Sequence, residues 1–164
     1  VRLIPAAVGG SSAADWKPGA YHPTTAARPL DDAVSRVAGA LGTGAPNAIL
    51  WHQGESDANE HSAPEYAAEL ERIVSQFRSA LGDQDLPFLA GTLGDFLVRK
   101  NPCATQINSA IRTLPVHVEC TAWVDASGLN DCGDGLHFDA SSARELGRRY
   151  ALALAPVLAP MCGR

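Results

Sequence analysis

A carboxylate and an imidazole stand three residues apart near the carboxyl end of the chain, in the segment Asp134-Gly-Leu-His137. Across a turn, this spacing can bring the Asp134 carboxylate against Nδ1 of His137. Such a contact fixes the tautomer of the imidazole and leaves Nε2 available as a general base. A surface aspartate followed by a helix-capping histidine has the same spacing, so the pattern predicts a base but also fits a structural role.

A second group of functional side chains follows an apolar run at residues 51–57, Trp-His-Gln-Gly-Glu-Ser-Asp. Gln53 offers amide N–H groups that can stabilise negative charge developing on an oxygen. Glu55 can anchor the loop or hold a substrate hydroxyl. A polar loop that only caps the next helix does not account for so many functional groups beside an apolar tryptophan, so we predict a site here.

A third group is the turn Gly9-Gly10-Ser11-Ser12. Two glycines let the backbone adopt positive φ angles and point its N–H groups into a cleft, as an oxyanion hole requires. A plain tight turn is the alternative reading of Gly9 and Gly10. Ser11 and Ser12 are candidate nucleophiles if no other serine serves.

The elements that must position these groups follow from hydrophobic periodicity and from helix start and stop signals. Strands are predicted at residues 2–8, 47–53, 87–93 and 116–124. Helices are predicted at 31–41, from Ser62 to 81, after Pro102 to 114, and from Ser141 or Ser142 to about 157. The alternation predicts a parallel sheet with helices on both faces, and such open sheets bind ligands at the carboxyl ends of their strands.

Composition narrows the class of protein. With 164 residues, 46% hydrophobic and 19% charged, the chain is the size of one globular domain. A net charge of −5 and the lack of a Lys/Arg cluster argue against a nucleic-acid partner, and no apolar run is long enough to span a membrane. The four cysteines fit the disulfides of a secreted or periplasmic protein as well as they fit buried thiols. The oligomeric state is left open.

Acidic and sulfur side chains also cluster around His137, which raises the alternative of a metal site. The candidate ligands are Asp131, Cys132, Asp134, His137 and Asp139. They mix hard and soft ligand types and lie too close together for a known loop pattern. We therefore predict neither a metal nor a cofactor.

Taken together, the three groups resemble the SGNH (GDSL-like) hydrolase superfamily, and within it the sialate O-acetylesterase and acetyl xylan esterase group, carbohydrate esterase family 6. Residues 51–57 are similar to that group's Trp-Tyr-Gln-Gly-Glu-Ser-Asp block and differ from it at His52. Residues 4–16 resemble its second block, and residues 134–137 resemble the Asp-x-x-His block that supplies the acid and base of its catalytic triad.

The resemblance implies a three-layer, flavodoxin-like α/β fold, with residues 1–164 as a single SGNH-type domain. One departure matters: the family's nucleophile is the serine of a Gly-Gln-Ser-Asn block on the first strand, and this chain has no such block. We therefore expect the chain to be the carboxyl-terminal portion of the domain, without a strand that is central in the family's sheet. A rearranged sheet using Ser11 or Ser12, or an inactive relative, are the alternatives.

By resemblance, the function is a serine esterase that removes O-acetyl groups from a small-molecule or oligosaccharide acetyl ester. His137 would be the base, oriented by Asp134, while Gly9 or Gly10 and Gln53 would bind the oxyanion. Glu55 would position its loop. Trp16 and Tyr21 are candidate walls for a sugar ring, or ordinary loop residues. A non-catalytic carbohydrate-binding relative and a metal-dependent hydrolase remain the alternative functions.

Overall fold

The structure is a computed structural model that describes residues 2–158. Three parallel strands, β1 (Ile49–Trp51), β2 (Phe88–Gly91) and β3 (Thr121–Val124), form one sheet in the order β1-β2-β3. The α-helices are α1 (Pro29–Leu41), α2 (Tyr66–Leu81), α3 (Asp95–Val98), α4 (Cys103–His117) and α5 (Ala140–Val157), and short 3-10 helices span Ala13–Asp15 and Ala63–Glu65.

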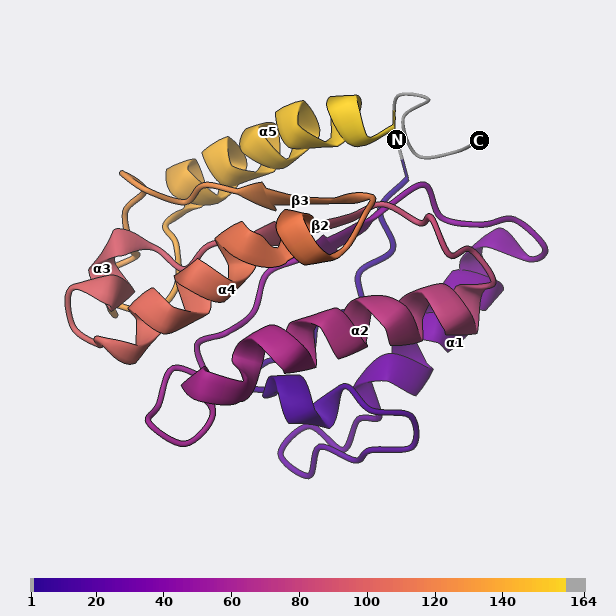
Figure 1. The fold of residues 1–164 in the computed structure, drawn as a ribbon, viewed down its shortest axis with the longest axis horizontal. Helices are drawn as coiled ribbons and strands as arrows, with labels where there is room; N and C mark the ends of the chain where they lie inside the picture. Colours follow the sequence, from indigo (N-terminus) through magenta and orange to yellow (C-terminus); the bar gives the residue numbers. More distant parts are fainter. Residues whose placement is uncertain (1, 159–164) are drawn as a thin grey trace.

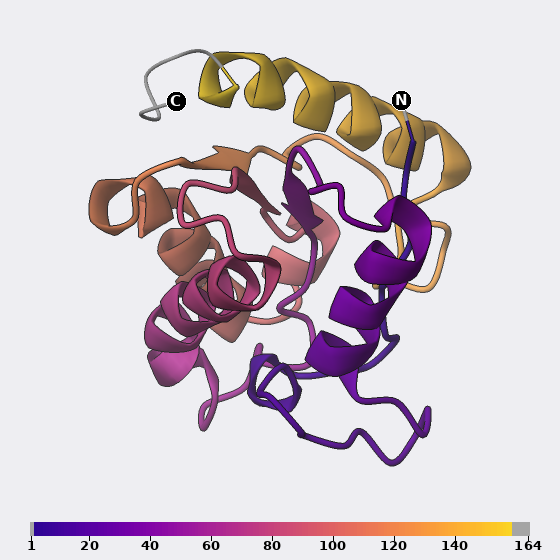
Figure 2. The same ribbon diagram turned by 90° about the vertical axis from the view of Figure 1, so that its right-hand side faces the viewer.

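Helices cover both faces of this sheet (Figures 1 and 2): α5 lies on one face, and α2 and α4 lie on the other. The pleat of β2 divides the core accordingly. Phe88 and Ala90 point into the larger core with α2 and α4, whereas Leu89 points into the smaller core with α5. The prediction of a parallel α/β sheet with helices on both faces is confirmed.

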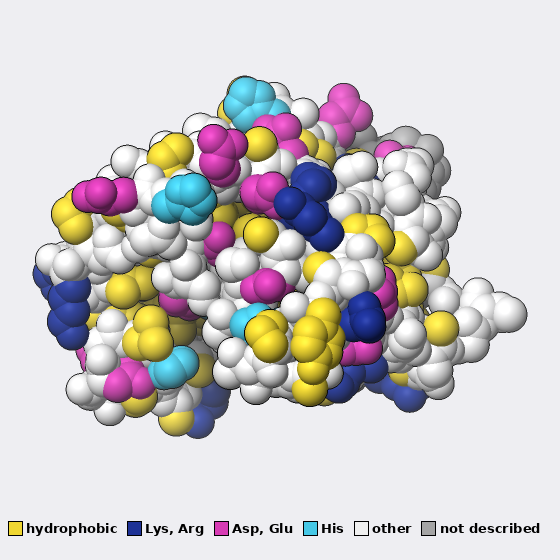
Figure 3. Space-filling view, turned by 90° about the horizontal axis from the view of Figure 1, so that it is seen from below, with side chains coloured by type: hydrophobic (Ala, Val, Ile, Leu, Met, Phe, Trp, Pro, Cys, Tyr) yellow, Lys and Arg dark blue, Asp and Glu magenta, His cyan; other side chains and the backbone are white. Residues whose placement is uncertain are grey.

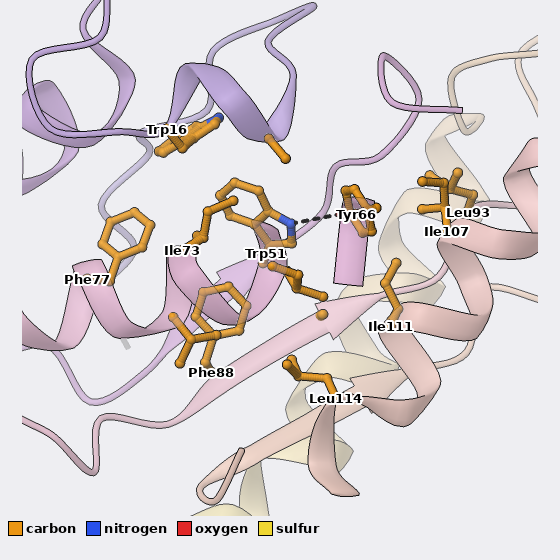
Figure 4. Close-up of a cluster of buried hydrophobic side chains, with 14 of the residues drawn as sticks. Trp16, Trp51, Tyr66, Ile73, Phe77, Phe88, Leu93, Ile107, Ile111 and Leu114 are labelled. Carbon is orange, nitrogen blue, oxygen red and sulfur yellow. Dashed lines mark hydrogen bonds between the residues drawn. The ribbon is translucent and has the colours of Figure 1, made fainter. Parts of the chain in front are cut away.

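The larger core is built around two tryptophans that come from distant parts of the chain (Figure 4). The rings of Trp16 and Trp51 meet edge to face with 4.9 Å between their centroids, and Trp51 also lies 5.9 Å from Phe88. The indole N–H of Trp51 donates to the Tyr66 hydroxyl at 3.4 Å, so the polar atoms of these two buried side chains have a partner. Trp16 is therefore a core residue, and its reading as a sugar-binding wall is wrong.

The predicted strand at residues 2–8 is not a strand in the structure. Its alternating pattern is real, since Ala6 and Val8 pack against the larger core. None of the backbone hydrogen bonds within residues 2–158 joins this segment to the sheet. The segment instead lies along α1, where Arg2 and Arg36 donate hydrogen bonds to Ala40 O and Pro5 O. A strand needs a neighbouring ladder, and β1 does not lie beside this segment.

Several predicted boundaries shift for identifiable reasons. Ser62 does not cap a helix: Asn59 Oδ1 accepts its N–H, and a 3-10 turn precedes α2. Residues 116 and 117 belong to α4 rather than to a strand, because Pro115 is accommodated in the last helical turn. The side chain of Asp139 accepts the N–H of Ser142, so α5 begins at Ala140 and runs through Pro156 to Val157.

The side of β1 that faces away from β2 has no partner strand among the described residues. Leu50, at its centre, is 48% exposed, although β2 and the cores around it are buried. A strand edge of this kind is normally covered or paired, because its N–H and C=O groups are open to other chains. The edge of β1 therefore remains available for a further strand.

Other expectations concern the surface and the thiols. No helix in the described part of the chain is long and apolar enough to cross a membrane. On the face shown in Figure 3, Lys and Arg side chains are interspersed with acidic ones rather than gathered. Cys103 and Cys132 are free thiols, and Cys162 lies outside the described residues, so the disulfide question stays a prediction for Cys120 and Cys162.

Candidate active site

Asp134 and His137 lie in a compact loop that closes on itself before α5. The loop is fastened at its base by an antiparallel bridge between Asp131 and Phe138 and by a hydrogen bond from the Cys132 N–H to His137 O. Within it, Asp134 Oδ2 lies 2.7 Å from His137 Nδ1, as the spacing of the two residues suggested. Asp134 Oδ1 accepts the N–H groups of Leu136 and His137, each at 2.8 Å.

The electrostatics of this pair favour a charged carboxylate facing an imidazole. The hydrogen bonds from the backbone and side chain of His137 hold the pKa of Asp134 well below its usual range. In return, the Asp134 carboxylate raises the pKa of His137. The His137 side chain is 73% exposed, and within residues 2–158 its Nε2 has no hydrogen-bond partner. The pair can therefore accept a proton at Nε2 from a group that approaches from outside.

The turn at residues 9–12 presents free donors of the kind an oxyanion hole needs. Gly10 has a φ of +75°, which favours glycine, and no described hydrogen bond uses the N–H of Gly9 or Gly10. Both glycines are exposed. Three bonds tie this turn to the loop after β1: Ser56 Oγ to Gly10 O, Gln53 Nε2 to Ser11 O, and the Ala13 N–H to Asp57 Oδ2.

Gln53 is buried and its amide is fully engaged inside the protein. Its Nε2 donates to Ser11 O at 3.0 Å and to Asp57 Oδ2 at 2.5 Å, and its Oε1 accepts from the Tyr66 hydroxyl at 3.2 Å. Burial raises the pKa of Asp57. In this structure Gln53 therefore links the two loops, and its role toward an oxyanion stays a prediction that needs one of these bonds to open.

Gly54, next to it, is required by close approach and by backbone conformation. Its φ is +142°, and a Cβ at this position would lie 2.5 Å from Ile107 Cγ2 of α4. The sequence suggested close backbone approach at Gly54, and the structure shows that α4 is the neighbour. Because Gly54 has no side chain, loop 53–57 can pack directly against α4, and this contact fixes the position of the loop relative to the sheet.

Glu55 lies between two histidines. Its Oε1 is 3.8 Å from His52 Nε2, and its charge contributes to the raised pKa of His137. Glu55 makes none of the hydrogen bonds described between loop 53–57 and the turn. The bonds that anchor that loop come from Gln53, Ser56 and Asp57, and the positioning role expected of Glu55 stays a prediction.

Ser11, the fallback nucleophile, is placed far from such a role. It is 3% exposed; its hydroxyl donates to Val8 O at 2.8 Å and accepts from the Trp16 indole at 3.0 Å. His137 makes no hydrogen bond to any serine in residues 2–158. The described chain therefore contains a base and its carboxylate without a serine paired to them.

The acidic side chains around His137 are used by their own loop. Asp131 Oδ2 accepts the N–H groups of Gly133 and Gly135, and Asp139 caps α5. No group of three or more His, Cys, Asp or Glu side chains within residues 2–158 is arranged to hold a metal ion. What the sequence suggested as a ligand cluster is a set of turn-forming hydrogen bonds.

Comparison with known proteins decides the family. The family profile for carbohydrate esterases described as sialic acid-specific acetylesterases matches residues 1–156 of the chain. The protein belongs to this family. The membership fits the order of the three motifs along the chain and the fold just described, and it confirms the resemblance found in the sequence.

One relative from Arabidopsis thaliana matches the chain both in sequence and in structure. A probable carbohydrate esterase of Arabidopsis thaliana is 27% identical over 159 residues, which are 93% of this chain and 55% of that protein. The X-ray structure of that Arabidopsis protein superposes with a TM-score of 0.80 at 25% identity, covering 93% of this chain and 59% of that one. The chain thus spans little more than half of this relative.

A more distant structure shares the fold alone. A carbohydrate acetylesterase from Xanthomonas citri superposes with a TM-score of 0.60 at 23% identity, covering 68% of this chain and 26% of that one. Like the Arabidopsis protein, it is considerably longer than the chain described here.

Proposed function

We propose that the protein is a serine esterase that removes O-acetyl groups from carbohydrates, with Asp134 and His137 as the acid and base of its triad. The observation that carries the proposal is the 2.7 Å contact between Asp134 Oδ2 and His137 Nδ1, with Nε2 exposed and unpartnered. Membership of a family described as carbohydrate esterases and sialic acid-specific acetylesterases supports the same reaction.

The reaction would run in two halves around His137. A serine hydroxyl attacks the acetyl carbonyl while Nε2 of His137 takes its proton, and the same proton then passes to the sugar oxygen as the C–O bond breaks. Water next attacks the acetyl-serine, again losing a proton to His137, and acetate leaves as the serine is regenerated. Throughout, the Asp134 carboxylate stabilises the imidazolium and keeps Nδ1 protonated.

Negative charge on the carbonyl oxygen would be met by the turn at residues 9–12. The N–H groups of Gly9 and Gly10 are the donors that no described residue uses. Gln53 would join them by redirecting an N–H that now binds Ser11 O or Asp57. The structure supports the backbone donors more directly than it supports Gln53.

The nucleophilic serine is proposed to lie outside residues 1–164, on a strand that pairs with the open edge of β1. Three observations support this: the unpartnered edge around Leu50, the segment at residues 2–8 without a strand partner, and the absence of a serine hydrogen-bonded to His137 within residues 2–158. A strand inserted between residues 2–8 and β1 would give both of them a ladder and carry its serine to the carboxyl edge of the sheet.

The substrate is proposed to be an acetylated sugar, with an O-acetylated sialic acid or an acetylated xylan as the two candidates to compare. The family description favours the sialic acid ester. The Arabidopsis relative is described as a probable carbohydrate esterase, which specifies no particular sugar.

The proposal is tested on the product of the complete gene. We expect it to release acetate from p-nitrophenyl acetate and from acetylated sugars. We expect His137→Ala to lower kcat by roughly 10⁴- to 10⁶-fold, with no effect of chelator on the wild-type rate. The matched control is His117→Ala, an exposed residue at the end of α4, which should retain full activity.

A fluorophosphonate probe locates the nucleophile. Mass spectrometry should find the label on a serine outside residues 1–164, and His137→Ala should lose it. A label on Ser11 or Ser12 would replace the proposed nucleophile. Binding of acetylated sugar without turnover would favour the non-catalytic relative, and loss of activity in chelator would favour a metal-dependent hydrolase.

A further inference from the structure

The loop that carries Asp134 and His137 is exposed, yet one of its side chains turns inward. Phe138, the residue directly after His137, packs between two rings from the carboxyl edge of the sheet. His52, which follows β1, meets it edge to face at 5.4 Å, and Phe96 of α3 meets it at 5.2 Å. We call His52, Phe138 and Phe96 the aromatic clamp.

The position of His52 in the clamp is fixed by the neighbouring strand. A Cβ on Gly91 of β2 would lie 2.7 Å from His52 Nδ1 and would collide with the Tyr150 hydroxyl. That hydroxyl donates to Trp51 O, so α5 holds the backbone immediately before His52. The missing side chain of Gly91 thus leaves the space into which the imidazole fits.

The His52 imidazole lies near one carboxylate, but its two nitrogens make no hydrogen bonds within residues 2–158. The side chain keeps a quarter of its surface exposed, but both ring nitrogens are buried and neither has a hydrogen-bond partner within residues 2–158. The one charged group beside them is Glu55, at 3.8 Å from Nε2. Leaving buried polar atoms unpaired is unfavourable, so simple packing would be served better by a phenylalanine.

We propose that His52 is a positioning residue that couples the two loops of the site: its ring supports Phe138 beside His137, and its Nε2 faces the Glu55 carboxylate. The groups that face His137 are then Asp134 from its own loop and Glu55 from loop 53–57. Lys100 lies against Gly135 of the same loop. His52 sets the distance between the Glu55 charge and the base, and it holds the alignment of the Asp134–His137 pair.

The chemistry follows from these contacts. A carboxylate near His137 favours its protonated form, so moving Glu55 or loosening the loop lowers the pKa of the imidazole. The burial of His52 lowers its own pKa, so it stays neutral near pH 7 and adds no opposing charge. A neutral ring in this position faces the Glu55 carboxylate without neutralising its charge.

The test measures the pKa of His137 by NMR titration of its ring protons in the product of the complete gene, with the signal assigned by its loss in His137→Gln. We expect the wild-type pKa to lie above 6.5 and His52→Ala to bring it down toward 6.5. The second readout is hydrogen exchange of the Cys132 N–H, which is bonded to His137 O and should exchange slowly in the wild type and faster in His52→Ala. His52→Phe should restore the packing of the loop, so this N–H should exchange slowly again. The pKa of His137 should stay partly lowered in His52→Phe. Glu55→Gln should lower the pKa with the Cys132 N–H unaffected.

A second variant, a control variant and an activity assay complete the test. If His52→Ala does not fold, Phe138→Leu removes the same support from the other side and should lower the pKa of His137 likewise. His61→Ala, in an exposed loop, is the matched control and should change neither readout. In acetate-release assays we expect His52→Ala to lower kcat roughly ten- to a hundredfold with KM unchanged.

A pKa of His137 that is the same in wild type, His52→Ala and Phe138→Leu would overturn the inference. So would a His52→Phe variant indistinguishable from wild type in both readouts, since Nε2 would then have no part. The inference rests on the proposed role of His137 as base, but the two fail differently. If the proposed function is wrong, the wild type releases no acetate, whereas the NMR readouts still report the coupling.

Discussion

Asp134 has the largest effect on the chemical character of His137. Asp134 uses one oxygen for the imidazole and the other for two backbone N–H groups, so the carboxylate cannot turn away without breaking the loop. The same arrangement keeps Asp134 ionised and makes His137 a stronger base than a free histidine. Because the imidazole itself is largely exposed, its pKa is set by this partner more than by burial.

A pH profile reports this partnership. Since a base must be neutral to accept a proton, kcat/KM of the complete protein is expected to rise with pH through an apparent pKa above 6.5. Asp134→Asn removes the charge that raises the pKa, so the inflection should move down toward 6.5, and kcat should fall by about 10⁴ as the tautomer is lost.

The control for this prediction is Asp85→Asn, an exposed carboxylate between α2 and β2. It should leave both the inflection and kcat unchanged. An inflection that stays in place in Asp134→Asn would show that another group controls the base.

At the scale of elements, the site is assembled by loops that the strands hold at one edge. Loop 53–57 carries most of the connections: it binds the turn at residues 9–12, rests on α4 through Gly54, and brings Glu55 toward His137. Its position depends on how closely β2 and α5 pack beside it, and at Gly91 of β2 the side chains of His52 and of Tyr150 in α5 occupy the space that a Cβ would take.

Gly91→Ala tests this contact. The added methyl group collides with His52 and Tyr150, so we expect the free energy of unfolding to fall by about 1–3 kcal/mol. Urea denaturation followed by circular dichroism measures the change. The matched control is Gly147→Ala in α5, where a Cβ meets open space and removal of a helical glycine should stabilise the protein by up to about 1 kcal/mol. A neutral Gly91→Ala would mean that β2 and α5 can move apart freely.

Local patterns predicted most elements and the Asp134–His137 contact, because short-range spacing determines both. The sheet partner of residues 2–8 could not be predicted in this way, since pairing depends on a neighbour elsewhere in the chain. The engagement of Gln53 by Ser11 and Asp57 escaped prediction for a related reason: a buried amide looks the same in sequence whether it serves a ligand or the protein. His52 was noted as a departure from the family block, but its contact with Phe138 spans most of the chain.

At the scale of the whole molecule the sheet has two edges, because β1 and β3 each pair with β2 alone within residues 2–158. Helices cover both faces of the sheet, and Leu50 at the centre of β1 is 48% exposed. His137 and the turn at residues 9–12, the proposed base and oxyanion donors, lie on loops beside the loop that follows β1. Under the proposed function, a strand paired with β1 would both extend the sheet and complete the triad.

Hydrogen exchange can follow that edge directly. In β1, the Ile49 N–H binds Pro87 O of the β2 side, so by strand alternation the Leu50 N–H points to the open edge. In a chain of residues 1–164 we expect the Leu50 amide to exchange rapidly while Leu89 in β2 is protected. In the product of the complete gene, a strand on this edge should slow the Leu50 amide to a rate close to that of Leu89. Rapid exchange of Leu50 in both proteins would contradict the proposed strand.

The hydrogen bonds that define the Asp134–His137 pair all come from residues 130–139. Closing a loop of about ten residues takes on the order of 10–100 ns, far less than pairing distant parallel strands requires. The contact between Asp134 and His137 therefore needs no pairing of distant segments. Placing that pair beside residues 9–12 and 53–57, by contrast, requires the whole sheet to be assembled.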